Sequence, residues 1–303
     1  MFYTAYGLSI RSEIELPELL PAVECEQSSA TDVQISMGRV SESGLTDARR
    51  IYDWLYVSPN VLWLDINGVA RFQITNGQHI TIDPYPGSDE ESIRVFLLGS
   101  AFGAILFQRG HFVLHGNAIS IGDQCLVCVG DSGAGKSTLA AGFMQRGYSI
   151  MSDDVVPIDE MQRAIPGFPR IKLWQETADH LGIDTTDLRR IRPDEKKFNY
   201  PLAEQFQTEP LPVRWVYVLD THDDDSIAME PLSGMRRFQP LYENTYRPDY
   251  LEGMKLEAWQ LRMCGQLAGK IHLVHIRRPR DGFDLEGLIT EILADIEKTP
   301  GLS

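Results

Sequence analysis

The chain contains the octapeptide Gly130-Asp131-Ser132-Gly133-Ala134-Gly135-Lys136-Ser137, followed by Thr138. It matches G-x-x-x-x-G-K-[ST], a loop whose glycines let several backbone N–H groups converge on phosphate oxygens. The helix expected to follow directs its N-terminus, which carries partial positive charge, at the same anion. Lys136 would supply a mobile charge for the β- and γ-phosphates, and the Ser137 hydroxyl is small enough to bind Mg²⁺ beside them. The stretch therefore predicts that residues 130–138 bind ATP with Mg²⁺.

The residues around this loop alternate between strand and helix patterns. An apolar strand is expected at 124–129 before the loop, and a helix is expected at 136–146 after it. A short strand at 148–151 then leads to Asp153 and Asp154. In a parallel sheet, the carboxyl end of that strand lies at the same edge as the loop, where ligands bind. Of two carboxylates placed there, one can hold Mg²⁺ and the other can accept the proton of an attacking hydroxyl.

Residues 1–87 are predicted to be rich in strands. Short strands are expected at 2–10 and 32–38. A three-stranded meander is expected where alternating segments are joined by Asn-Gly pairs, which suit tight hairpin turns because both positions tolerate positive φ. The three strands of this meander are 61–66, 69–75 and 78–83. We expect this region to dock a substrate or partner, and residues 88–303 to form the nucleotide-binding catalytic domain.

The remaining elements are predicted from apolar periodicity and from capping signals. Ser88 and Glu91 form a capping box, which predicts a helix over 89–108. Gly122-Asp123 predicts a hairpin turn between strands at 111–121 and 124–129. Further helices are expected near 173–181, 252–268 and 285–296, and further strands at 214–219 and 271–276.

Composition excludes several classes of protein. The 303 residues include 28 Lys and Arg against 43 Asp and Glu, a net charge of −15, which opposes general nucleic-acid binding and polybasic membrane attachment. The longest apolar stretch, 95–107, is too short to span a bilayer, and the N-terminal residues lack the pattern of a signal peptide. Four cysteines are too few for a disulfide framework in a chain of this length: Cys25, Cys125, Cys128 and Cys264. We therefore expect a cytoplasmic protein.

Four stretches resemble the catalytic domain of HPr kinase/phosphorylase: residues 130–137, Arg146-Gly147-Tyr148, residues 152–156 and His115-Gly116. That family shares its nucleotide fold with phosphoenolpyruvate carboxykinases and transfers phosphate to a serine of a small carrier protein. The resemblance implies an α/β fold, with a phosphoenolpyruvate-carboxykinase-like P-loop kinase core and a β-rich N-terminal region.

The resemblance also implies roles for individual residues. Lys136 and Ser137 would bind phosphate and Mg²⁺, and Lys136 would assist the transfer. Asp153 would be the catalytic base and Asp154 the Mg²⁺ partner, although the resemblance leaves open which aspartate has which role. His115 would lie near the transferred phosphate, with a structural role as the alternative.

The expected function follows from these residues and from one difference from the usual HPr kinase/phosphorylase sequence. Thr138 stands where the family usually has glutamate, and the chain resembles the shorter HPr-kinase-related proteins, some of which phosphorylate a serine on a precursor peptide. We expect an ATP- and Mg²⁺-dependent serine kinase that acts on a small protein or peptide. The alternatives are a small-molecule kinase with a carboxykinase-like core and a nucleotide-dependent regulatory module without phosphotransfer. The oligomeric state stays open, with a homo-oligomer among the options.

Several basic residues are further candidates for binding phosphate or an acidic peptide, with a solvated surface as the alternative. Arg170 and Lys172 would share one face of a strand because they are two positions apart. Cys125 and Cys128 would point to opposite faces of one strand, so we expect core thiols and no zinc site. The other basic candidates are Arg189, Arg190, Arg192, Lys196, Lys197, Arg277, Arg278 and Arg280.

Overall fold

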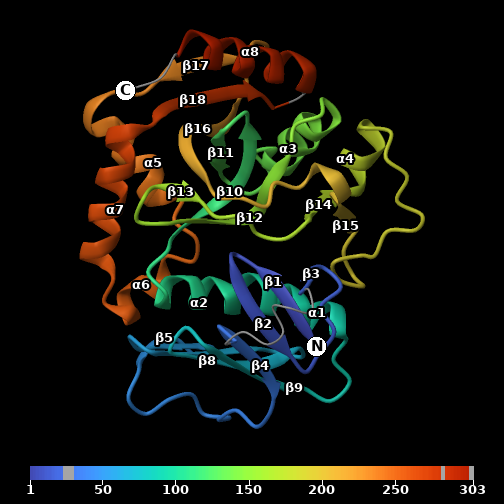
Figure 1. Cartoon of the computed structure of the whole chain (residues 1–303), viewed down its shortest axis with the longest axis vertical. Helices are drawn as coiled ribbons and strands as arrows, with labels where there is room; N and C mark the ends of the chain where they lie inside the picture. Colours follow the sequence, from blue (N-terminus) through green and yellow to red (C-terminus); the bar gives the residue numbers. More distant parts are fainter. Residues whose placement is uncertain (23–30, 281–283, 300–303) are drawn as a thin grey trace.

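The structure is a computed structural model that describes residues 1–22, 31–280 and 284–299. Its strands and helices form layers (Figure 1). In that view the nine-stranded sheet of described strands lies toward the bottom and a helical layer rests on it. The seven-stranded sheet follows, with helix α8 (Leu285–Lys298) across its top. The protein is thus a mixed α/β protein with several sheets. Cys25 lies outside the described residues.

The nine-stranded sheet has the order β3-β1-β2-β4-β9-β8-β7-β6-β5. The predicted meander is present as three antiparallel strands. Asn76 and Gly77 both have positive φ at its second turn, whereas at the first turn Gly68 does and Asn67 does not. The prediction of one strand over 2–10 was wrong, because Tyr6 and Gly7 have positive φ and turn it into a hairpin. The strands are β1 (Phe2–Ala5), β2 (Leu8–Ser12), β3 (Leu20–Pro21), β4 (Val33–Met37), β5 (Arg49–Tyr52), β6 (Leu55–Val57), β7 (Val61–Ile66), β8 (Ala70–Thr75) and β9 (His79–Pro84).

The predicted helix over 89–108 is present but consists of three parts. They are α1 (Glu90–Phe96), a π-helical stretch η1 (Leu97–Ala101) and α2 (Phe102–Gln108). Asp89 caps α1, since its carboxylate accepts a hydrogen bond from the Ser92 N–H at 2.7 Å. The predicted cap, Ser88, instead donates its hydroxyl to the Tyr85 carbonyl at 2.9 Å.

The seven-stranded sheet carries the phosphate-loop motif. Its strands are β10 (Phe112–Ile121), β11 (Gln124–Gly130), β12 (Ile150–Ile158), β13 (Arg163–Ala164), β16 (Leu211–His222), β17 (Ala228–Pro231) and β18 (His272–Pro279). The β10–β11 hairpin turns at Gly122-Asp123 as predicted. β16 runs parallel to both β11 and β18, so the carboxyl ends of these three strands meet at one edge.

One prediction about this sheet was wrong. β12 is longer than the predicted strand at 148–151, and it runs antiparallel to β10. Asp153 and Asp154 therefore lie within the strand, opposite Asn117 and Gly116, and not beyond its carboxyl end. Their place near the loop comes from pairing across the sheet, which the sequence pattern did not reveal.

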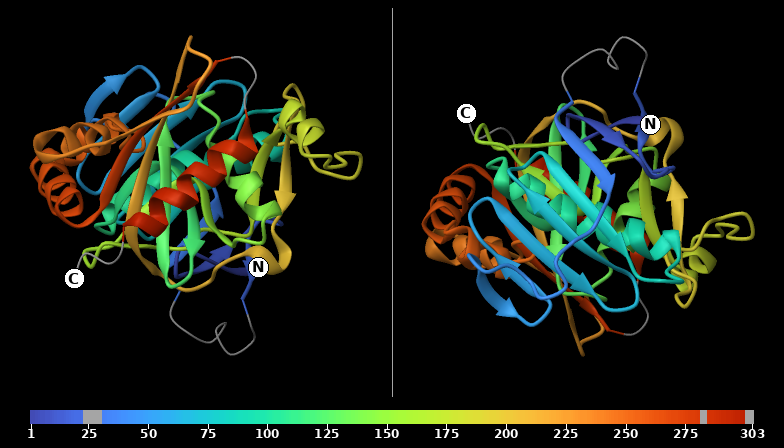
Figure 2. Two further views of the ribbon diagram at one scale, coloured as in Figure 1. Left: turned by 90° about the horizontal axis from the view of Figure 1, so that it is seen from above. Right: turned by 90° about the horizontal axis from the view of Figure 1, so that it is seen from below.

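The other elements surround this sheet. Lys255 has a φ of 59° and divides the predicted helix 252–268 into two. The views of Figure 2 show α8 crossing the sheet from above and the nine-stranded sheet below. The elements are α3 (Lys136–Gln145), β14 (Arg170–Trp174), α4 (Gln175–His180), β15 (Lys197–Pro201), η2 (Ala203–Gln205), η3 (Gly234–Arg237), α5 (Phe238–Glu243), α6 (Asp249–Met254), α7 (Glu257–Lys270) and α8 (Leu285–Lys298).

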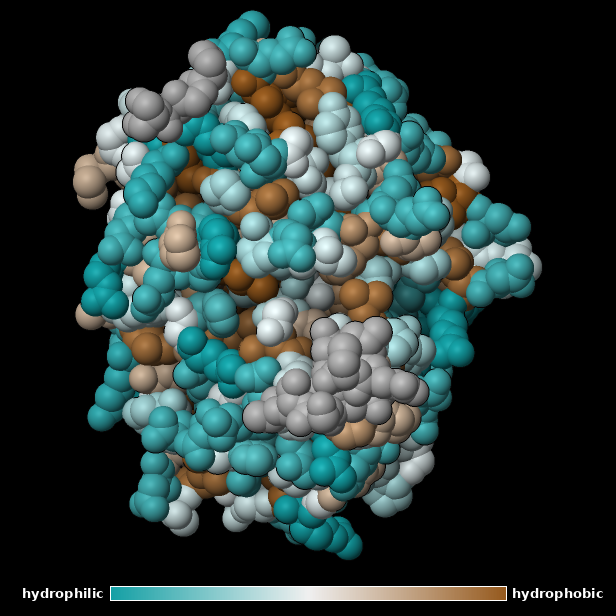
Figure 3. Space-filling model, viewed as in Figure 1, coloured by the Kyte–Doolittle hydropathy of each residue, from teal (hydrophilic) through white to brown (hydrophobic). Residues whose placement is uncertain are grey.

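Apolar packing joins the layers. One cluster buries the nine-stranded sheet against α1, η1, α2 and α6, and it also includes Phe168 and Tyr246. Cys125 and Cys128 are both buried but belong to two different clusters, which agrees with their predicted opposite faces. The face in Figure 3 is largely hydrophilic, with small hydrophobic areas between polar residues. In the part of the chain that is described, no helix combines the length and the apolar character needed to cross a membrane.

Candidate functional site

The glycine-rich loop joins β11 to α3 and depends on three glycines. Gly130, Gly133 and Gly135 have φ values of 138°, 85° and 101°, a region that side chains with a Cβ rarely adopt. A Cβ on Gly130 would lie 2.2 Å from the Leu219 carbonyl oxygen of β16, so only glycine fits between these strands. Gly135 is the N-cap of α3, and the first-turn N–H groups of that helix have no partner within the helix. These N–H groups and the helix dipole suit an anion.

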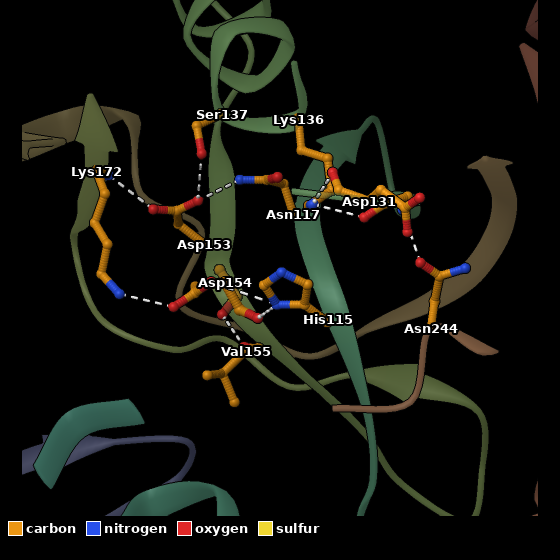
Figure 4. Close-up of polar contacts among 12 residues, drawn as sticks. His115, Asn117, Asp131, Lys136, Ser137, Asp153, Asp154, Val155, Lys172 and Asn244 are labelled. Carbon is orange, nitrogen blue, oxygen red and sulfur yellow. Dashed lines mark hydrogen bonds and ion pairs between the residues drawn. The ribbon is translucent and has the colours of Figure 1, made fainter. Parts of the chain in front are cut away.

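Lys136 lies under the loop. Its side-chain Nζ donates to the carbonyl oxygens of Gly130 at 2.7 Å and Asp131 at 3.0 Å, as Figure 4 shows. Only 9% of the residue is exposed, and this burial lowers its pKa. A bound phosphate would replace the neutral carbonyl partners with an anion and would stabilise the charged ammonium.

Two residues outside the motif hold the loop. Arg278 donates its Nε–H to the Ala134 carbonyl at 2.9 Å, and its Nη2 lies 3.4 Å from the Gly133 carbonyl. The Asn244 side-chain oxygen accepts a hydrogen bond from the Gly130 N–H at 2.9 Å. Arg278 was one of the basic candidates from the sequence. Asn244 was not a candidate, because it follows the short helix α5 and no motif marks it.

Asp153 points toward the loop helix (Figure 4). Its Oδ1 accepts hydrogen bonds from the Ser137 hydroxyl at 3.3 Å and from the Asn117 side-chain amide. Its Oδ2 accepts the backbone N–H of Lys172 at 2.7 Å. Burial, and after it the negative charge of Asp154, raise the pKa of Asp153 above its usual range. The sequence predicted Asp153 but missed Asn117, although Asn117 lies two positions after His115 and so on the same strand face.

Asp154 faces a different set of partners. Its Oδ2 lies 2.7 Å from Lys172 Nζ, and its Oδ1 lies 3.4 Å from His115 Nδ1. Burial alone would raise the pKa of Asp154, but attraction to Lys172, and to His115 at pH values where its imidazole is protonated, outweighs burial and lowers the pKa. Asp154 has a φ of 76° although it lies within β12, an unusual conformation for a residue with a Cβ.

His115 and Gly116 occupy β10 opposite the two aspartates. Burial lowers the pKa of His115, so the imidazole is neutral at neutral pH. Its Nδ1 also lies 3.1 Å from the Asp154 carbonyl oxygen, which orients the ring. A Cβ on Gly116 would lie 2.3 Å from the Cys128 carbonyl oxygen, which explains glycine at this position.

These groups surround a cavity of about 430 Å³. Of the predicted site residues, nine line it and three, Gly130, Asp131 and Ala134, do not. Two of the basic candidates, Lys197 and Arg278, line it as well, and four lining residues were not candidates: Asn117, Trp174, Glu176 and Thr177.

The basic candidates divide between this cavity and the surface. Lys172 and Lys197 lie beside the aspartates, and burial lowers the pKa of Lys197. Arg192 instead lies within 3.4 Å of Asp194 and Glu195. The basic cluster at 189–197 is therefore not one phosphate clamp.

The donor set fits magnesium. A hydroxyl and a carboxylate meet at Ser137 and Asp153, and Mg²⁺ prefers such oxygen ligands together with substrate phosphates and water. Because burial and the neighbouring Asp154 disfavour ionised Asp153, a divalent cation there would stabilise the charged carboxylate. Asp154 is less suited, because Lys172 already occupies one of its oxygens with a positive charge.

Neither protein-family models nor curated proteins match the sequence. Among solved structures, one similar protein is the HPr(Ser) kinase/phosphatase from Coxiella burnetii. The two share 11% identity and superpose with a TM-score of 0.30, and the match covers 61% of this chain and 95% of that chain. The relation to HPr kinases that the motifs suggested is thus a distant one at most.

Proposed function

We propose that this protein is an ATP- and Mg²⁺-dependent kinase that phosphorylates a serine of a small protein or peptide. The observation that carries the proposal is the cavity in which a glycine-rich loop, a buried lysine and two adjacent aspartates meet. Phosphoryl transfer needs positioning and charge neutralisation more than covalent chemistry, and this cavity offers both. The division into a docking region at 1–87 and a catalytic domain at 88–303 is part of the proposal.

The loop and its helix would hold the nucleotide. The amides of α3 and the ammonium of Lys136 would bind the β- and γ-phosphates, with Arg278 keeping the loop in shape. Ser137 and Asp153 would hold Mg²⁺, which when bound supplies positive charge to the phosphate oxygens. The resemblance suggested Asp153 as the base and Asp154 as the Mg²⁺ partner. We assign these roles the other way round, because Asp153 is the aspartate that the Ser137 hydroxyl contacts.

Asp154 would then accept the proton of the acceptor serine. The serine oxygen forms a bond to the γ-phosphorus while the bond from that phosphorus to the β–γ bridging oxygen breaks, leaving ADP. The serine hydroxyl would donate to Asp154, which its low pKa keeps ionised, and the proton passes to this carboxylate as the bond to phosphorus forms. Lys172 and the neutral His115 would orient this carboxylate, and Lys197 would offset charge on the transferring group.

Transfer from labelled ATP tests the proposal. The protein is incubated with γ-labelled ATP, Mg²⁺ and a library of serine-containing peptides, and the labelled amino acid is identified after hydrolysis. Phosphoserine that depends on Mg²⁺ is expected. Label on a metabolite would instead favour the small-molecule kinase, and binding of ATP with no transfer to any acceptor would favour the regulatory module.

Paired aspartate variants test the two roles. Asp154→Asn is expected to bind Mg²⁺-ATP with parental affinity and to lose transfer, whereas Asp153→Asn is expected to lose the gain in ATP affinity that Mg²⁺ gives. Asp123→Asn, in the exposed β10–β11 turn, removes one charge elsewhere and serves as the control. Full turnover by Asp154→Asn would remove the base assignment.

A further inference from the structure

A second cavity lies beside the catalytic one, at the other end of the β14–β15 ladder. It has a volume of about 560 Å³, within the range of ligand sites. Trp174 and Lys197, paired at one end of the ladder, line the catalytic cavity. Arg170 and Pro201, paired at the other end, line the second cavity. One two-stranded sheet therefore connects the two.

The inner wall of the second cavity carries buried polar atoms without partners among the described residues. Arg170 is 5% exposed; its Nη1 donates to Asn199, but its Nε–H has no acceptor. The Glu18 side chain is 9% exposed; its Oε1 accepts from Arg94 Nε at 3.0 Å, but its Oε2 has no donor. A buried polar group left unpaired costs about 1–3 kcal/mol. Both atoms have almost no solvent-accessible surface, so a ligand would pair with them after a change of side-chain rotamer in Glu18 and Arg170.

The chemistry of the wall defines that ligand. One unpaired donor and one unpaired acceptor match the C=O and N–H groups of a peptide backbone, which offers both. The remaining wall is mostly apolar, with Pro17, Leu20, Pro169, Leu188, Pro201 and Phe206. Such a wall accepts an apolar side chain. The negative charge of Glu18 offsets the positive charge of Arg170, so this pair does not favour an anionic ligand.

We propose that this second cavity binds an extended segment of the phosphoacceptor and holds an apolar side chain close to the acceptor serine. The proposal rests on the proposed kinase function. Lys172, whose ammonium contacts Asp154, is two positions from Arg170 on β14. At about 3.3 Å per residue, an extended segment would place its apolar residue roughly two or three positions from the serine. Glu18 and Leu20 bring the N-terminal region into this docking site.

The test uses two libraries of peptides with randomised flanking positions. In the first library the central residue is alanine, and binding without ATP is read by sequencing the retained peptides. In the second it is serine, and phosphorylated peptides are sequenced. Enrichment of Leu, Ile, Phe or Met two or three positions from the centre is expected in both libraries. An absence of that enrichment among retained alanine peptides overturns the proposal.

Variants locate the binding. Leu188→Asp puts a charge into the apolar wall and is expected to abolish the enrichment and to raise KM for an apolar peptide by about tenfold or more, with a smaller change in kcat. Leu261→Asp, on the exposed surface of α7, is the matched control and is expected to keep both the enrichment and the parental KM. Unchanged selection in Leu188→Asp would refute the assignment. Selective binding of alanine peptides with no transfer to serine peptides would instead refute the kinase function and leave the docking site standing.

Discussion

Replacing Lys136 by alanine tests the loop as a nucleotide site. In the protein as described, Nζ lies 2.7 Å and 3.0 Å from two carbonyl oxygens, and it must exchange these partners for phosphate. One unit-charge pair at about 4 Å and an effective dielectric constant near 20 contributes about 4 kcal/mol. The two hydrogen bonds that the ammonium gives up are charge-assisted, so their loss offsets about 1.5 kcal/mol each. The net loss on removing the ammonium is therefore about 1 kcal/mol, or roughly fivefold in Kd.

The assay is titration calorimetry with Mg²⁺ and a non-hydrolysable ATP analogue. Lys136→Ala leaves two loop carbonyls without their donor, so the melting temperature and circular dichroism of the variant must also be measured. Lys270→Ala, at the exposed end of α7, removes the same charge far from the motif and is expected to bind like the parent. A folded Lys136→Ala whose Kd stays within about threefold of the parent would refute the charge argument.

Three further changes probe the strands and the aspartates. Gly116→Ala places a Cβ 2.3 Å from a carbonyl oxygen of the adjacent strand and is expected to destabilise the protein by about 1–3 kcal/mol in denaturant titration. Gly265→Ala, in α7 with nothing within 4 Å, should instead be neutral or stabilising. Lys172→Met removes a positive charge that lowers the pKa of both Asp153 and Asp154, so both pKa values should rise and the acid limb of the pH–rate profile should move to higher pH. In its proposed role Asp153 holds Mg²⁺, and its pKa is raised, so protons and Mg²⁺ should compete for it. The apparent pKa of the acid limb should therefore fall as the Mg²⁺ concentration is increased.

Local signals predicted the local structure well. The Asn-Gly pairs, the Gly122-Asp123 turn and the glycine-rich loop each specify a backbone conformation within a few residues, and each hairpin or loop is present. The opposite faces of Cys125 and Cys128 follow from strand alternation alone.

The sequence pattern failed where a feature depends on distant neighbours. The direction of β12 depends on its pairing with β10, and the left-handed Lys255 that divides α6 from α7 carries no glycine or proline signal. Asn244 reaches Gly130 across 114 positions of sequence, a contact that no local motif encodes. Asn117 is different, because its alternation with His115 was visible in the sequence and could have identified it.

The backbone of Asp154 connects these observations. Successive side chains of a regular strand point to opposite faces, so adjacent aspartates within β12 would be separated by the sheet. Both nevertheless line the same cavity, and Asp154 has a φ of 76°. A side chain held in this region costs on the order of 1–3 kcal/mol and persists only where its surroundings fix it. Here Lys172 and His115 contact the carboxylate and hold it in place. The strained residue is therefore what brings two carboxylates of an antiparallel strand into one cavity.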